Sequence, residues 1–162
     1  MLGALMFCSK LVMAALPNIH LIGMFTMTFT LVFRKKALLP VYVYVFLEGL
    51  YFGFNVWWIP YLYIWTILWA VTMLLPRGMP KKTKCIVYPV VCCLHGLLFG
   101  TLFAPVYALI MGMKFKSMLA WIAAGLPFDA VHAAGNLATG LLILPLSELL
   151  EKLMNSIYAK EK

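Results

Sequence analysis

The sequence has few charged residues. Only 11% of its 162 residues are charged and only five are acidic, whereas 65% are hydrophobic. Soluble domains are about half apolar and about a quarter charged, and a domain of this size has too little interior to bury so much apolar surface. A soluble enzyme, a disordered chain and a nucleic-acid-binding domain are therefore disfavoured. The composition predicts a small all-α integral membrane protein.

Several chemical motifs are also missing. There is no Gly-rich phosphate loop, so the chain is not expected to hydrolyse ATP itself, and no internal repeat of the kind found in inverted-repeat transporters. Ser9 and Ser117 have no base at a matching spacing, which argues against a hydrolase. Asp129 and His132 could share a metal ion with Glu48 or His95, but no zinc motif or cysteine pair accompanies them. We therefore expect no catalytic residue, metal or cofactor in this chain.

The apolar residues form six segments, which predicts a six-transmembrane-helix bundle in a single domain, 1–162. The expected spans cover residues 2–16, 19–33, 37–54, 61–75, 85–111 and 118–146, and an amphipathic tail follows at 147–162. The fifth span is long enough to tilt or to contain a break near Pro105. The first segment resembles the core of a signal peptide, but it lacks a charged leader and an A-x-A site, which favours a membrane span.

Basic residues set the predicted orientation. With the N-terminus inside, the inner loops and tail hold ten Lys and Arg residues, while the outer loops hold only Lys114 and Lys116. Lys10 lies within the first span. Because basic residues concentrate on the cytoplasmic side, both termini are expected in the cytoplasm of a multi-pass protein of a bacterial-type plasma membrane.

The fifth span carries a small residue at every fourth position. This stripe consists of Cys92, Gly96, Gly100, Ala104, Ala108 and Gly112. Small residues let helix backbones approach closely in lipid. The stripe indicates either packing within the chain or a face that docks on a partner.

The last span places Gly125, Asp129, His132 and Asn136 on one helical face. Ionisable groups inside a membrane are costly and need a partner or a function. Glu48, in the third span, is expected to lie at a depth in the membrane similar to that of Asp129. Two interpretations remain: a polar floor for a ligand cavity open to the outside, or an internal network, for example between Asp129 and Lys10 or a histidine.

Aromatic residues crowd the outer turn between the third and fourth spans. They form either an interfacial belt or a lid that stacks on a flat heterocyclic solute. The predicted substrate-binding residues combine this group with the polar floor and the two outer turns: Asn18, Glu48, Asn55, Trp57, Trp58, Tyr61, Trp65, Trp121, Asp129, His132 and Asn136.

Three features resemble the substrate-binding S components of energy-coupling factor (ECF) transporters over nearly the whole chain. They are the short six-span plan, the break of the first helix at Leu16-Pro17-Asn18, and the last helix from Gly125-Leu126-Pro127-Phe128-Asp129 through Asn136 to Pro145-Leu146 with its amphipathic tail. The resemblance implies capture of a small water-soluble vitamin or related micronutrient at the outer face.

The resemblance also implies partners: a transmembrane coupling (T) subunit and two cytoplasmic ATPase subunits that hydrolyse ATP. S components dock through small residues on the first helix, and Gly3, Ala4 and Cys8 are the nearest match here. The alternative is a standalone proton-coupled carrier or channel with Lys10, Glu48, Asp129 and His132 as a relay. A third interpretation is a structural subunit whose polar residues satisfy only one another.

Overall fold

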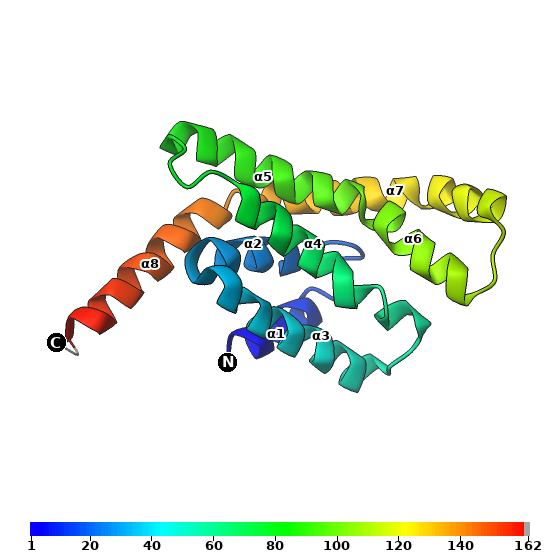
Figure 1. The fold of residues 1–162 in the computed structure, drawn as a ribbon, viewed down its shortest axis with the longest axis horizontal. Coiled ribbons are helices and arrows are strands. Elements are labelled where there is room, and N and C mark those ends of the chain that lie inside the picture. Colours follow the sequence, from blue (N-terminus) through cyan, green and yellow to red (C-terminus); the bar gives the residue numbers. More distant parts are fainter. Residues whose placement is uncertain (161–162) are drawn as a thin grey trace.

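The computed structural model describes residues 1–160, which form helices and turns without any strand (Figure 1). The α-helices are α1 (Leu2–Val12), α2 (Ile22–Phe33), α3 (Leu38–Phe52), α4 (Tyr61–Leu74), α5 (Lys81–Leu97), α6 (Phe99–Ile110), α7 (Phe115–Gly140) and α8 (Ile143–Lys160). Short 3-10 helices, η1 (Arg34–Ala37) and η2 (Val56–Trp58), precede α3 and α4. The all-helical prediction is confirmed for this part of the chain.

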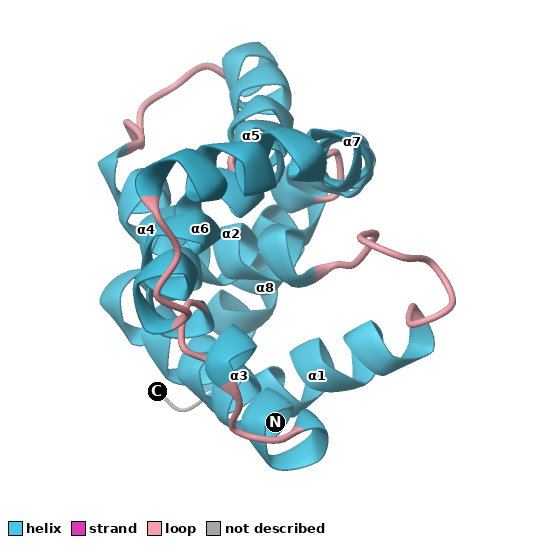
Figure 2. Cartoon of the chain, turned by 90° about the vertical axis from the view of Figure 1, so that its right-hand side faces the viewer, coloured by secondary structure: helices cyan, strands magenta, loops and turns pink. Residues whose placement is uncertain are grey.

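Helix α2 occupies the centre of the bundle. Viewed from one end, α1 and α3 lie on one side of it and α5 and α7 on the other, with α4 beside it (Figure 2). Eight of its twelve residues are buried. Buried threonines in α2 are compatible with this position because Thr30 donates to the Thr26 carbonyl and Thr28 to the Met24 sulfur.

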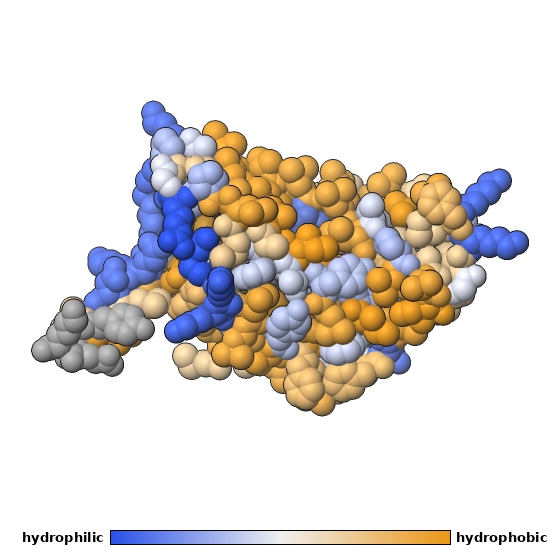
Figure 3. Space-filling model, viewed as in Figure 1, coloured by the Kyte–Doolittle hydropathy of each residue, from blue (hydrophilic) through white to orange (hydrophobic). Residues whose placement is uncertain are grey.

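The molecule has two polar ends and an apolar side. The α4–α5 and α7–α8 connections lie at one end and the α6–α7 connection at the other (Figure 1). Hydrophilic surface gathers at these ends, and hydrophobic surface covers most of the face between them (Figure 3). Three segments are long and apolar enough to cross a membrane: Val56–Leu74, Lys81–Ile110 and Phe115–Gly140. These features are those of a membrane protein.

The first three helices are shorter than the spans predicted for them. At about 1.5 Å per residue, the eleven residues of α1 extend roughly 16 Å and the twelve of α2 roughly 18 Å. The hydrocarbon core of a bilayer is about 30 Å thick. Residues 13–21, which the prediction divided between two spans, instead form a connecting loop.

The fifth predicted span does break, at Leu98 and not near Pro105. Leu98 separates α5 from α6, which leaves the α5 axis (Figure 1). Pro105 lies inside α6. The first turn of α6 is held by a side chain from α7, because the Gly100 N–H donates to Asp129 Oδ1 at 3.1 Å.

The last predicted span also ends earlier than expected. Helix α7 stops at Gly140, and α8 begins at Ile143, so the helical tail starts before residue 147. Pro145 falls in the first turn of α8, where its missing N–H costs no helical hydrogen bond. Glu161 and Lys162 of the predicted tail lie outside the described residues.

The small-residue stripe packs within the chain. A Cβ added at Gly96 would lie 3.1 Å from the Ala133 backbone of α7, and one at Gly100 would lie 2.5 Å from Asp129 Oδ2. Cys92, Ala104 and Ala108 are buried. The stripe from Cys92 to Ala108 therefore forms the seam between α5, α6 and α7, as the first of the two interpretations predicts. Gly112 lies after the end of α6, is exposed, and has no atom within 4 Å of an added Cβ.

Candidate functional site

The polar row of α7 lies inside the bundle. Asp129, His132 and Asn136 are 6%, 4% and 0% exposed, whereas neighbouring Val131 and Leu137 face outward. This arrangement agrees with the requirement that carboxylate, imidazole and amide groups avoid lipid. Two of the three side chains also support helix packing: Asp129 accepts from Gly100, and Asn136 Nδ2 donates to the Cys92 carbonyl at 3.1 Å.

His132 instead belongs to a compact group of rings. Its ring centroid lies 4.7 Å from that of His20 and 4.9 Å from that of Phe99. The Trp65 ring contacts the rings of His20 and Phe99, with centroid distances of 5.9 Å and 5.8 Å. His95 lies 5.6 Å from Trp65. We call His20, His95, His132, Trp65 and Phe99 the histidine–aromatic cluster.

Five different elements build this cluster. The α1–α2 loop supplies His20, α4 supplies Trp65, α5 supplies His95, α6 supplies Phe99 and α7 supplies His132. The Leu98 break between α5 and α6 places His95 and Phe99 on the two sides of a bend. The cluster therefore depends on the whole bundle and not on one local motif.

The cluster has unused hydrogen-bonding capacity. His95 Nε2 lies 3.1 Å from the Ile64 carbonyl oxygen, but four other buried nitrogens have no partner among the described residues. These atoms are His20 Nδ1, Trp65 Nε1, His95 Nδ1 and His132 Nε2. Asp129 Oδ2, Asn136 Oδ1, Glu48 Oε1 and the Tyr44 hydroxyl are likewise unpartnered. Since buried polar groups are ordinarily hydrogen-bonded, these atoms are free to bond to water or to a polar solute.

A buried ion pair lies beside the cluster. Lys10 Nζ on α1 contacts Glu48 Oε2 on α3, and the Glu48 side chain is fully buried. The same ammonium lies 5.3 Å from the Tyr61 ring centroid and 5.6 Å from that of Phe52. Tyr61 in turn contacts Trp65 at 6.0 Å. The pairing of Lys10 with Asp129, which the internal-network interpretation gave as an example, is therefore not formed.

Two pockets approach this region from the surface. One, of about 210 Å³, is lined by Lys10, Asn18, His20 and Phe52 together with apolar residues of the α1–α2 loop. The other, of about 280 Å³, is lined by residues of α6 and α7, namely Phe99, Gly100, Phe103, Trp121, Gly125, Phe128 and Asp129. The predicted residues Asn18, Trp121 and Asp129 thus border openings next to the cluster.

The outer indoles of Trp57 and Trp58 pack on other rings and on α3, and the described residues show no ring contact between them and a histidine. Trp58 Nε1 donates to the Val45 carbonyl at 2.7 Å, which fastens η2 to α3. Trp57 packs against Tyr61 at 5.5 Å and Phe52 at 6.4 Å. Asn55 is exposed. Of the predicted aromatic lid, only Tyr61 and Trp65 contact the cluster or belong to it.

The predicted docking residues on α1 face two directions. Gly3 is buried against α3, where an added Cβ would lie 2.7 Å from the Pro40 carbonyl oxygen. Ala4 and Cys8 are exposed on the opposite face. Only these two are available to another protein.

The cluster offers groups that could hold a polar solute. Its rings offer stacking surfaces, and its imidazole and indole nitrogens offer hydrogen bonds to a polar edge. The described residues contain no group of three or more His, Cys, Asp or Glu side chains arranged to hold a metal ion.

Sequence reasoning did not include Lys10, His20, His95 and Phe99 among the predicted site residues. The available signal was the rarity of ionisable residues in apolar segments, which applies to Lys10 and both histidines. No signal at the level of spacing marks Phe99, because a lone aromatic residue in an apolar helix is ordinary.

No protein-family model, curated protein or solved structure matches this chain.

Proposed function

We propose that the chain is the substrate-binding S component of an ECF-type importer, which captures a small water-soluble vitamin or related micronutrient. The observation that carries the proposal is the set of unpartnered nitrogens on His20, Trp65, His95 and His132 inside an apolar bundle. A purely structural network would satisfy those atoms internally. A flat solute with a polar edge would supply the missing hydrogen bonds and stack on the rings.

The proposed topology has six spans, with both termini in the cytoplasm. The short helices α1, α2 and α3 then cross with help from their loops, and the basic end, which includes Arg34, Arg77 and Lys84, faces the cytoplasm. The α1–α2 loop, with His20, lies toward the outside. The absence of a nucleotide-binding loop in the sequence is consistent with energy supplied by a T subunit and two ATPases.

The central experiment is to purify the full chain without partners and without ATP, then identify any retained small molecule by mass spectrometry. Binding of that compound is measured by quenching of indole fluorescence, because Trp65 lies in the cluster. The proposal expects one tightly bound heterocyclic solute per chain. A bundle that binds no member of a vitamin panel, and that needs no ATPase for transport, contradicts it.

Replacing His132 by Phe tests the site directly. The ring is kept, but the unpartnered Nε2 is lost. Loss of a hydrogen bond in a buried polar site costs about 1–3 kcal/mol, so solute affinity should fall roughly tenfold to a hundredfold. Val131→Ala, on the outward face of the same helix, is the matched control and should bind normally. Equal affinity in the two variants would remove His132 from the site.

The alternative is a standalone proton-coupled carrier. The observation that favours it is the Lys10–Glu48 pair, which places two ionisable groups beside Tyr61 and the histidines. Proteoliposomes that contain only this chain separate the two proposals. Uptake that is abolished by a protonophore supports the carrier, whereas uptake only after addition of a coupling subunit and ATPases supports the S component.

A further inference from the structure

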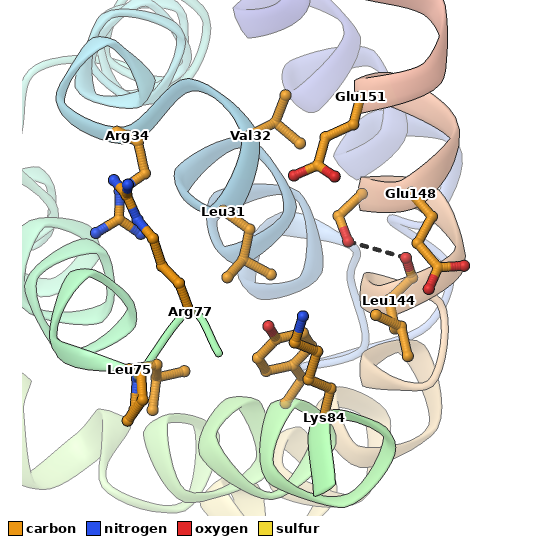
Figure 4. A pocket seen from close by; sticks show the side chains of 12 residues that line it. Leu31, Val32, Arg34, Leu75, Arg77, Lys84, Leu144, Glu148 and Glu151 are labelled. Carbon is orange, nitrogen blue, oxygen red and sulfur yellow. Dashed lines mark hydrogen bonds between the residues drawn. The ribbon is translucent and has the colours of Figure 1, made fainter. Parts of the chain in front are cut away.

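A separate pocket of about 430 Å³ opens at the basic end of the bundle. It lies between the end of α2, the α4–α5 connection, the first turns of α5, and α8 (Figure 4). Its volume is within the range of roughly 300–1,000 Å³ typical of small-molecule sites. None of its lining residues belongs to the histidine–aromatic cluster, so its function does not depend on the function proposed above.

The pocket carries an excess of positive charge. Arg34, Arg77 and Lys84 line it together with Glu148 and Glu151, and the two arginines lie on the side away from the two glutamates (Figure 4). Glu148 is already paired with Lys81 at 2.9 Å. Among the side chains that the structure describes, the ion pairs are those of Lys10 with Glu48 and Lys81 with Glu148. The three cations of the pocket therefore have no carboxylate partner within this part of the chain.

Arg34 is held in place by contacts that leave its charge unneutralised. Its backbone has a φ of 56°, which is unfavourable for a residue with a Cβ. Trp69 Nε1 donates to the Arg34 carbonyl at 3.1 Å, and Arg34 Nη2 donates to the Met73 carbonyl at 3.1 Å. Its Nε atom is buried without a partner among the described residues. Strained residues fixed in this way are concentrated at functional sites.

The rest of the lining consists of Tyr88, Ser147 and five apolar side chains, those of Leu31, Val32, Leu75, Pro76 and Leu144. A cationic recess with apolar walls, placed where membrane-spanning helices end, matches an amphipathic anion. Basic pockets between transmembrane helices on the cytoplasmic side are known to hold lipid headgroups. We propose that this pocket binds a phosphate group through Arg34, Arg77 and Lys84, and that an anionic phospholipid is the form its apolar walls favour.

The test titrates phosphatidylglycerol into the delipidated full-length protein in detergent and follows lipid adducts by native mass spectrometry. The variant R77Q/K84Q removes two cations that make no hydrogen bond within the described residues. At about 1 kcal/mol per basic residue, it should bind roughly thirtyfold more weakly. K35Q/K36Q carries the same change of charge on exposed lysines outside the pocket and should bind like the wild type.

A second variant works in the opposite direction. Glu151→Gln removes a carboxylate from the lining and should raise lipid affinity about fivefold. If the Glu151 carboxylate had only a structural role, its replacement by glutamine would not strengthen lipid binding. This arm also keeps the test decisive if R77Q/K84Q does not fold.

Inorganic phosphate, titrated by calorimetry, distinguishes the two sources of the anion. Binding of phosphatidylglycerol but not of inorganic phosphate identifies a lipid site. Phosphate binding that is lost in R77Q/K84Q, without preference for the lipid, identifies a site for a soluble phosphate. Equal weakening in R77Q/K84Q and K35Q/K36Q, or no binding of either ligand by the wild type, overturns the proposal.

Discussion

Lys10→Met should lower the free energy of unfolding by about 3 kcal/mol, because it leaves the Glu48 carboxylate alone in the bundle. The Glu48 side chain is fully buried, and its other oxygen, Oε1, has no hydrogen-bond partner in the described residues. Methionine fills a similar volume, so the change removes the charge without creating a large cavity. Thermal and denaturant unfolding in detergent micelles, followed by circular dichroism, measures the effect.

Removing the other partner of the ion pair, Glu48, should lower the free energy of unfolding by less. Glu48→Gln leaves Lys10, whose side chain is 24% exposed and whose ammonium lies near the rings of Tyr61 and Phe52. Those aromatic faces continue to stabilise the cation. We therefore expect Glu48→Gln to cost about half as much as Lys10→Met, and the double variant to recover most of the loss because no buried charge remains.

Lys36→Met is the control for loss of a lysine, since Lys36 is exposed and outside both ion pairs. Its unfolding should match that of the wild type. If Lys10→Met and Lys36→Met behave alike, the Lys10–Glu48 pair does not hold α1 against α3. Additive effects in the Lys10→Met/Glu48→Gln double variant would lead to the same conclusion.

The sequence was sufficient to predict the helical class and the faces that pack. The four-residue repeat from Cys92 to Ala108 predicted a close helix seam, and that seam is formed with α7. Helix boundaries were less predictable, because apolar residues also form connections in this chain: residues 13–16 are apolar and lie in the α1–α2 loop. Beside the break at Leu98, the Gly100 N–H donates to Asp129, which lies twenty-nine positions after Gly100, and no local pattern predicts this contact.

The candidate site was predictable only along one helix. The spacing of Asp129, His132 and Asn136 follows from helical periodicity, so their shared face could be deduced. Which side chains from other helices meet that face depends on helix rotation and on the path of the α1–α2 loop. This is why His20 was not predicted as a neighbour of His132, and why His95 was considered there only as a possible metal ligand. The same limit applies to Trp58, whose indole nitrogen donates to the Val45 carbonyl of α3.

Gly140→Ala should destabilise the protein by about 3 kcal/mol, the upper part of the usual range for overpacking. An added Cβ would lie 2.7 Å from Pro89 Cα and 3.2 Å from Pro89 Cβ. The first of these is a backbone atom of α5, in a residue whose ring fixes its own φ. No side-chain rotation can relieve the overlap, so the end of α7 must move away from α5.

Gly125→Ala is the matched control because it lies on the same helix with no atom within 4 Å of the added Cβ. There the substitution should be neutral or should stabilise the helix by up to about 1 kcal/mol, the difference in helix propensity between the two residues. Unfolding of both variants in micelles gives the comparison.

Separation of α5 from α7 would also weaken the Asn136–Cys92 hydrogen bond, and it would displace His95 from His132. Solute binding should therefore fall in Gly140→Ala. Equal stability of the two variants, or unchanged solute binding in Gly140→Ala, would mean that the α5–α7 seam is not as close as the Gly140–Pro89 contact requires.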